Sequence, residues 1–130
     1  MASANPDPIR IVLVEDLPDD VFFIRRALAH AGIDADFVVV TDEGPFRSAL
    51  REARTSIVLT DHRMPRFNAL RAIDVALSVA PWVPVVVVTA AMLEDEATEA
   101  RRRGARDIVR KEELARLPSV VRRLVGGLPS

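Results

Sequence analysis

Residues 56–65 read SIVLTDHRMP, an apolar run that ends in a carboxylate. The β-branched and apolar side chains at 57–60 are typical of a buried strand, and Met64-Pro65 stops it. Asp61 stands at the carboxyl end of this strand, where a buried run rarely places a charge without a reason. This segment is informative about both the fold and the site, because an apolar run that ends in a polar side chain recurs along the chain.

Apolar runs and helical patterns alternate five times along the chain. The run at 85–89 is apolar on both faces, which is typical of a strand in a parallel sheet covered by helices on both sides. We therefore expect an α/β fold of the flavodoxin-like (βα)5 type, a doubly wound five-stranded parallel sheet with the strand order 2-1-3-4-5. The expected strands are 9–14, 37–40, 57–60, 85–89 and 107–110, and the expected helices are 19–31, 45–53, 69–79, 94–103 and 112–125.

The composition restricts the classes of function. The chain has 130 residues, the length of one domain, which we expect at 9–126 with a flexible leader at 1–8 and a tail at 127–130. Its 18 basic and 19 acidic residues leave a net charge of −1, and so give no reason to expect direct binding to nucleic acid or to a membrane surface. The absence of cysteine excludes disulfides and thiolate metal sites. The N-terminus has no apolar signal-peptide core and no run approaches the ~18 residues of a membrane span, so we expect a cytoplasmic protein.

Polar side chains gather where the expected strands end. In chain order they are Glu15-Asp16, Asp61, Thr89 and Lys111, the last being the only lysine beside 17 arginines. Parallel strands end at one edge of the sheet, so carboxylates on neighbouring strands lie about 5 Å apart and repel each other unless a cation lies among them. Oxygen ligands without His or Cys favour Mg²⁺. With an ammonium and a hydroxyl added, the set is suited to holding a phosphoryl group.

Each of these residues also has an ordinary explanation. An acidic pair after a strand is usually a loop or an N-cap, an aspartate at a strand end is often a turn residue, and a lysine at a helix start is usually solvated. The ordered placement at the strand ends favours a joint site over these separate explanations. For two other features we prefer the ordinary explanation. His62 is expected to point to the opposite face from Asp61. The arginines at 101–103 are expected to form a solvated helix end rather than a nucleic-acid patch.

Four motifs together resemble the receiver domain of two-component response regulators, over residues 9–125. They are VLVED at 12–16, D-x-x-M-P at 61–65, VPVVVVTA at 83–90 and GARDIVRK at 104–111. Each motif is weak alone, whereas the ordered set is highly specific. The C-terminal segment KEELARLPSVVRRL resembles receivers that stand alone or form part of a larger signalling protein.

The resemblance assigns a role to each residue of the acidic edge. Asp61 would accept a phosphoryl group from a histidine kinase or a phosphotransfer protein. Thr89 would bind the phosphoryl oxygens through its hydroxyl, and Lys111 would pair with them. The Mg²⁺ ligands would be Asp16 directly, Glu15 through water, Asp61, and the backbone carbonyl of Arg63. Such a chain is a phosphoacceptor switch rather than an enzyme, is a monomer or a weak homodimer, and signals through a downstream protein that the sequence does not name.

Three positions depart from the family's pattern. Ile108 stands where an aromatic residue is usual, and Glu112 stands where a proline usually follows the lysine. Ala69 replaces a common glycine, and we expect the turn to have shifted to Asn68, because asparagine tolerates left-handed backbone. Ile108 is the most consequential change, since a β-branched side chain is stiff and has no hydroxyl to pair at the surface. We therefore expect the loop after Thr89 and the helix at 94–103 to carry the conformational response.

Three other functions fit the sequence less well. A Mg²⁺-dependent phosphatase with an aspartyl nucleophile usually carries a D-x-D motif after the first strand, where this chain has EDLP at 15–18. A pure interaction module with a degenerate site is disfavoured because the acidic, threonine and lysine positions are all filled. A dinucleotide-binding domain lacks its signature here, since no G-x-G-x-x-G follows the first strand.

Overall fold

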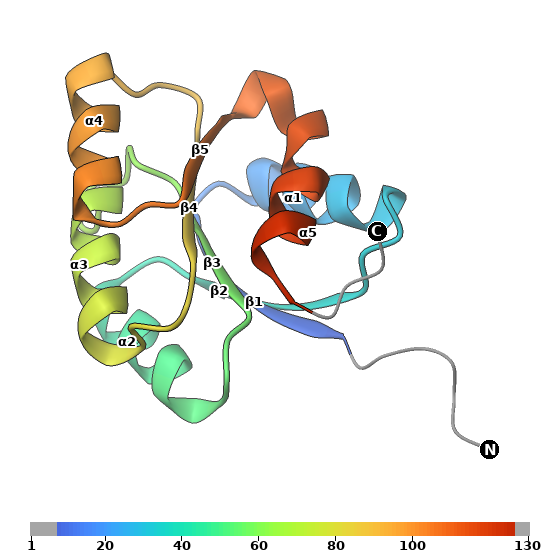
Figure 1. The fold of residues 1–130 in the computed structure, drawn as a ribbon, viewed down its shortest axis with the longest axis horizontal. Helices are drawn as coiled ribbons and strands as arrows, with labels where there is room; N and C mark the ends of the chain where they lie inside the picture. Colours follow the sequence, from blue (N-terminus) through green and yellow to red (C-terminus); the bar gives the residue numbers. More distant parts are fainter. Residues whose placement is uncertain (1–7, 127–130) are drawn as a thin grey trace.

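Five parallel strands form one sheet in the order β2-β1-β3-β4-β5, as expected for the flavodoxin-like fold (Figure 1). The computed structural model describes residues 8–126, so the expected tail at 127–130 and all but the last residue of the expected leader at 1–8 lie outside the described residues. The strands are β1 (Ile9–Val14), β2 (Ala35–Val40), β3 (Ile57–Thr60), β4 (Val85–Thr89) and β5 (Asp107–Arg110). The helices are α1 (Pro18–His30), α2 (Glu43–Glu52), α3 (Ala69–Val79), α4 (Glu94–Arg103), a 3₁₀ helix η1 (Lys111–Arg116) and α5 (Leu117–Leu124).

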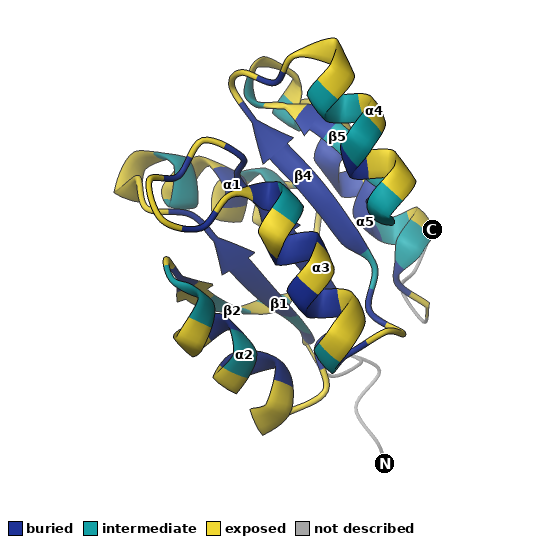
Figure 2. Cartoon of the chain, turned by 90° about the vertical axis from the view of Figure 1, so that its left-hand side faces the viewer, coloured by how far each residue is buried: buried dark blue, intermediate teal, exposed yellow. Residues whose placement is uncertain are grey.

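Alternate residues of each central strand enter two separate cores, because successive side chains of a strand point to opposite faces. Val12 and Val58 pack with α2, α3 and α4 on one face, and Ile11 and Leu59 pack with α1 and α5 on the other. Figure 1 shows these two helical layers on either side of the sheet. Figure 2 shows the central strands buried and the outer faces of α2, α3 and α4 exposed. No helix within residues 8–126 is long and apolar enough to cross a membrane.

Pairing and local chemistry shift several element boundaries from those expected. β2 begins at Ala35 rather than at 37, because Ala35 pairs with Ile9 of β1 and the ladder extends the strand beyond its apolar run. α1 begins at Pro18, whose missing N–H costs nothing in the first turn of a helix.

The prediction of one helix over 112–125 is wrong. Residues Lys111–Arg116 form the 3₁₀ helix η1, which contains non-helical backbone at Glu113, and α5 begins only at Leu117. Pro118 explains the division, because it has no N–H to donate and its ring excludes the preceding α-helical turn. The expectation of a single helix rested on the spacing of apolar residues and did not take Pro118 into account.

The expected left-handed turn at Asn68 is also wrong. Asn68 has φ of −83° and ψ of 172°, and its side-chain oxygen accepts a hydrogen bond of 3.0 Å from the Arg71 N–H. Among residues 8–126, only glycines have positive φ. Asn68 therefore serves as the N-cap of α3, which is the role in which a short polar side chain satisfies a free backbone donor.

Candidate functional site

Three carboxylates meet at the carboxyl edge of the sheet. Glu15 and Asp16 follow β1 and Asp61 follows β3, and one ligand oxygen from each lies within 4.8 Å of the others. The register explains the closeness, because Val14 is paired with Thr60 and the Asp61 N–H donates to the Val14 carbonyl at 2.9 Å. The expectation that these side chains gather is confirmed.

Lys111, the first residue of η1, is the cation of the site. Its Nζ lies 2.8 Å from Glu15 Oε1 and 3.1 Å from Asp61 Oδ2. Its shortest contact, 2.6 Å, is with Asp20 Oδ2 in the first turn of α1. The ammonium donates hydrogen bonds to Asp20 and Asp61 and forms an ion pair with Glu15, so one cation serves three carboxylates.

Burial controls the charges of the site. Glu15 is only 1% exposed, and burial raises the pKa of its carboxyl above the ordinary value of 4.5, although Lys111 partly offsets this effect and the Asp61 charge adds to it. Burial tends to lower the pKa of Lys111, but its bonds to Asp20, Glu15 and Asp61 outweigh burial and raise it. Lys111 is therefore charged at neutral pH.

The donor set fits a hard divalent cation. Glu15 Oε1 is buried and forms an ion pair with Lys111 without accepting a well-directed hydrogen bond. The Asp16 carboxylate is exposed and takes no hydrogen bond or ion pair from the described part of the chain. One ammonium therefore faces an excess of carboxylates, and their oxygens are the ligands that Mg²⁺ prefers.

Thr89, at the end of β4, is buried, but its hydroxyl does not contact Asp61. Thr89 Oγ1 donates to the Ala91 carbonyl at 3.2 Å and accepts from the Ala91 N–H at 3.3 Å. These bonds turn the hydroxyl toward the loop between β4 and α4. The role expected for Thr89 at a phosphoryl group needs a rotation of its side chain and stays a prediction.

The loop after Asp61 is tied to α4. The His62 N–H donates to Asp61 Oδ1 at 2.7 Å, while the ring Nε2 lies 3.0 Å from Glu96 Oε2. The Arg63 guanidinium donates to Glu96 Oε1 at 2.9 Å. The His62 side chain thus points away from the acidic site, as its sequence position predicts. The expected metal role of Arg63 concerns its backbone carbonyl and stays a prediction.

Two functional contacts were missed in the sequence. Asp20 in the first turn of a helix suggests only a favourable interaction with the helix dipole, yet it is the nearest partner of Lys111. Its place just after the first strand, on the acidic edge, was the available signal. Nothing in the sequence indicates that Glu96 contacts His62, because the two residues are 34 positions apart and their approach depends on side-chain direction.

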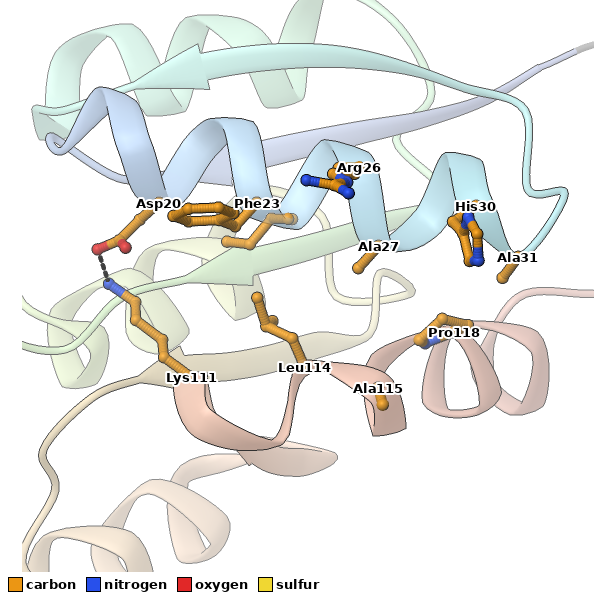
Figure 3. Close-up of a pocket in the computed structure, with 11 residues that line it drawn as sticks. Asp20, Phe23, Arg26, Ala27, His30, Ala31, Lys111, Leu114, Ala115 and Pro118 are labelled. Carbon is orange, nitrogen blue, oxygen red and sulfur yellow. Dashed lines mark hydrogen bonds and ion pairs between the residues drawn. The ribbon is translucent and has the colours of Figure 1, made fainter.

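An apolar groove of about 580 Å³ adjoins the acidic site between α1 and the η1–α5 segment. Figure 3 shows Leu114 and Pro118 facing Phe23 and Ala27 of α1, with the Lys111–Asp20 contact at one end. The non-α-helical course of η1 forms one wall of this groove. Apolar surface therefore lies next to the ammonium that contacts Asp61.

Comparison with known sequences gives one family and one curated relative. Residues 11–122 match the model of the response regulator receiver domain. The chain is 31% identical over 128 residues to the response regulator protein FleR of Pseudomonas aeruginosa, covering 92% of this chain and 25% of the relative. The chain thus spans about a quarter of the length of that relative.

Solved structures share the fold at low sequence identity. A response regulator from Hahella chejuensis is similar with a TM-score of 0.81 and 21% identity, covering 94% of this chain and 98% of that one. The receiver domain of the sensor histidine kinase PA1611 from Pseudomonas aeruginosa, with a magnesium ion in its active site cleft, has a TM-score of 0.78 and 23% identity, covering 93% and 100%. The phosphorylated cyanobacterial phytochrome response regulator RcpA has a TM-score of 0.73 and 22% identity, covering 90% and 91%.

Proposed function

The chain belongs to the response regulator receiver domain family, and we propose that it accepts a phosphoryl group on Asp61 from a histidine kinase or a phosphotransfer protein. Receiver domains are regulatory switches, and here the switch would signal to a downstream protein. The observation that supports the proposal most strongly is the position of the Asp61 carboxylate, which lies in the acidic cluster and 3.1 Å from Lys111 Nζ. The direct test is the intact mass of the chain after incubation with acetyl phosphate and Mg²⁺.

The proposed transfer moves a phosphoryl group from nitrogen to oxygen. A carboxylate oxygen of Asp61 attacks phosphorus in line with the leaving group, forming a P–O bond as the P–N bond of the donor phosphohistidine breaks. The electron pair of the broken bond leaves with the imidazole, which is protonated at its other nitrogen and departs neutral. Lys111 places positive charge beside the reacting oxygens, where charge develops during transfer.

We propose that Mg²⁺ is the cofactor of this reaction. Asp16, Asp61 and the Arg63 carbonyl would hold the ion, and Glu15 would hold it through water. When bound, Mg²⁺ supplies the positive charge that neutralises the phosphoryl oxygens. The magnesium in the cleft of the PA1611 receiver domain supports the same assignment for this chain.

The groove beside Lys111 supports a protein as the phosphoryl donor. A donor protein has to bring its phosphohistidine to Asp61 at the sheet edge, and the groove offers it apolar surface directly beside the site. Phe23 of α1 lines the groove and is exposed, and so is its neighbour in the sequence, Phe22. Exposed aromatic side chains of this kind are favourable anchors in protein interfaces.

Asp16→Ala should lower the affinity for Mg²⁺ by more than the roughly 10- to 100-fold typical of losing a residue that only supports a ligand, because Asp16 is proposed as a direct ligand. In metal-free buffer the free energy of unfolding should hold or rise, since the Asp16 carboxylate is exposed and its removal relieves repulsion within the acidic cluster. Calorimetric titration with Mg²⁺ and thermal unfolding in EDTA measure the two effects.

Asp19→Ala is the matched control for this variant. Asp19 is an exposed acid in the first turn of α1, so the control removes one charge from the same end of the molecule. It should leave Mg²⁺ affinity nearly unchanged. A clear loss of metal-free stability in Asp16→Ala would assign Asp16 a structural role, and unchanged Mg²⁺ affinity would reject it as a ligand.

A further inference from the structure

Glu96 joins the loop that carries Asp61 to the first turn of α4. One of its oxygens, Oε1, accepts from the Leu93 N–H at 2.9 Å and from the Arg63 guanidinium at 2.9 Å. The other, Oε2, lies 3.0 Å from His62 Nε2. Leu93 has no side-chain acceptor, and two carboxylates serve the free N–H groups at this end of α4: Glu96 accepts from the Leu93 N–H, and Asp95 Oδ1 accepts from the Glu96 N–H at 2.9 Å. Any change in the His62 contact therefore acts on one of the groups that cap this helix.

His62 is held at both ends. Its N–H donates to Asp61 Oδ1 at 2.7 Å, and its ring is only 4% exposed. Its Nε2 must carry the proton in the contact with Glu96, because a carboxylate can only accept, and the hydrogen bond from His62 lowers the pKa of Glu96 and keeps it ionised. The buried ring is joined to Glu96 through Nε2, so a displacement of the His62 peptide alters the contact between the two side chains. A change at the His62 peptide is therefore passed to Glu96.

Phosphorylation changes the acceptor to which the His62 N–H donates. When one carboxylate oxygen of Asp61 bonds to phosphorus, the carboxylate becomes an acyl phosphate and its negative charge passes to the phosphoryl oxygens. The remaining oxygen is then a neutral acceptor, and hydrogen bonds to neutral acceptors are about half as strong as those to ionised ones. The bond that fixes the His62 peptide is weakened as a direct result.

Two further observations favour His62 as the connection to α4. Its Nδ1 is buried and has no hydrogen-bond partner within the described part of the chain, which disfavours the present ring position by the cost of an unpaired acceptor. Ile108, packed half-buried against the core on the α4 side of the sheet, has no polar group with which to report a change at the site. A hollow of about 450 Å³ lined by His62, Arg63 and Glu96 leaves room for the loop to rearrange.

Given phosphorylation of Asp61 as proposed, we infer that His62 is a positioning residue that transmits the state of Asp61 to the N-terminus of α4 through Glu96. The surface that changes then contains Arg63, 53% exposed, and Leu93, 62% exposed, which both donate to Glu96 Oε1. A downstream protein would read this surface rather than the region around Ile108. Transmission requires only that the two states differ in their contacts with His62, which is the condition for any shift of a conformational equilibrium.

The test compares the natural chain with His62→Leu and His62→Gln before and after incubation with acetyl phosphate and Mg²⁺. Leucine fills the buried site but cannot bond to Glu96, whereas the glutamine amide can place a donor near the position of His62 Nε2. In the natural chain, phosphorylation should change amide exchange at residues 93–97 by about fivefold or more, within the range of typical coupling between sites. The change should be lost in His62→Leu and restored in His62→Gln, while intact mass shows that all three chains gain the phosphoryl group.

The ring nitrogens of the natural chain give a second measurement that needs no variant. The chain has two histidines, so the exposed His30 serves as an internal reference in a ¹⁵N spectrum. The His62 signals should shift on phosphorylation and the His30 signals should not. Unchanged His62 signals, or an unaltered response at 93–97 in His62→Leu, would overturn the role of His62 while leaving phosphorylation of Asp61 intact. Absence of any mass gain in the natural chain would overturn both proposals.

Discussion

An Asp61→Asn chain should gain no phosphoryl group from acetyl phosphate, whereas the natural chain should gain one in the presence of Mg²⁺ and none in EDTA. The substitution keeps the size of the side chain and removes the nucleophilic carboxylate. Phosphorylation should therefore be abolished rather than slowed, because no group is left to accept the phosphoryl group. The carboxamide oxygen of this variant can still accept from the His62 N–H or from Lys111, so the fold should persist. Intact mass spectrometry measures the gain directly.

Asp36→Asn is the matched control, because Asp36 is an exposed aspartate on β2, far along the strand from the carboxyl edge. It should be phosphorylated like the natural chain. A persistent phosphoryl adduct on Asp61→Asn would place the acceptor elsewhere, and a natural chain without any adduct would reject the proposed function.

Lys111→Met should lower both the stability of the metal-free protein and the rate of phosphorylation. The variant leaves Glu15 and Asp61, both buried, without the only cation in contact with them among the described residues. Removal of one partner from a buried ion pair typically costs 3–5 kcal/mol, and we expect about 3 kcal/mol because Glu15 can partly relieve the cost by taking up a proton. The rate of phosphorylation should fall by about 100-fold, as for the loss of one donor to a developing anion. Urea unfolding in EDTA and timed mass measurements give the two values.

The stability loss in Lys111→Met should depend on pH and on metal. Burial raises the pKa of Glu15 above 4.5, so between 4.5 and that raised value the folded chain binds more protons than the unfolded chain. Lys111 lowers the pKa of Glu15, so the variant without it should have the larger rise in this pKa and gain more stability than the natural chain as the pH falls. The deficit of the variant should therefore shrink from pH 7 toward pH 4.5. Mg²⁺ should reduce the deficit as well, because binding to the folded state stabilises it.

Lys111→Arg separates charge from shape. Arginine keeps the positive charge, so most of the metal-free stability should remain, but its planar fork cannot replace the compact ammonium among three carboxylates. Phosphorylation should therefore be slow in Lys111→Arg although the protein is stable. A Lys111→Met protein as stable as the natural chain in EDTA would show that the acidic cluster needs no internal cation.

The sheet and the edge on which the site lies could both be predicted from the amino-acid sequence. Short apolar runs at a spacing of about 25 residues leave few alternatives to a parallel sheet covered on both faces. Once that sheet is accepted, Glu15, Asp61 and Lys111 must lie together, because each directly follows a strand and the strands end at one edge. These features depend on backbone periodicity and on position within an element, both of which are local properties of the chain.

The contacts between side chains at that edge could not be predicted from the sequence and depend on the packed fold. Side-chain torsions determine that Asp20 is the nearest partner of Lys111 and that Glu96 is the partner of His62. They also determine that the Thr89 hydroxyl bonds to Ala91. Those torsions are set by packing between elements whose contacting residues lie 91 and 34 positions apart in the first two cases. The division of η1 from α5 is different in kind, because Pro118 marks it in the sequence by a local rule of backbone hydrogen bonding. No local sequence pattern predicts contacts between distant side chains, because these contacts form and stabilise the protein only after the layers have packed together.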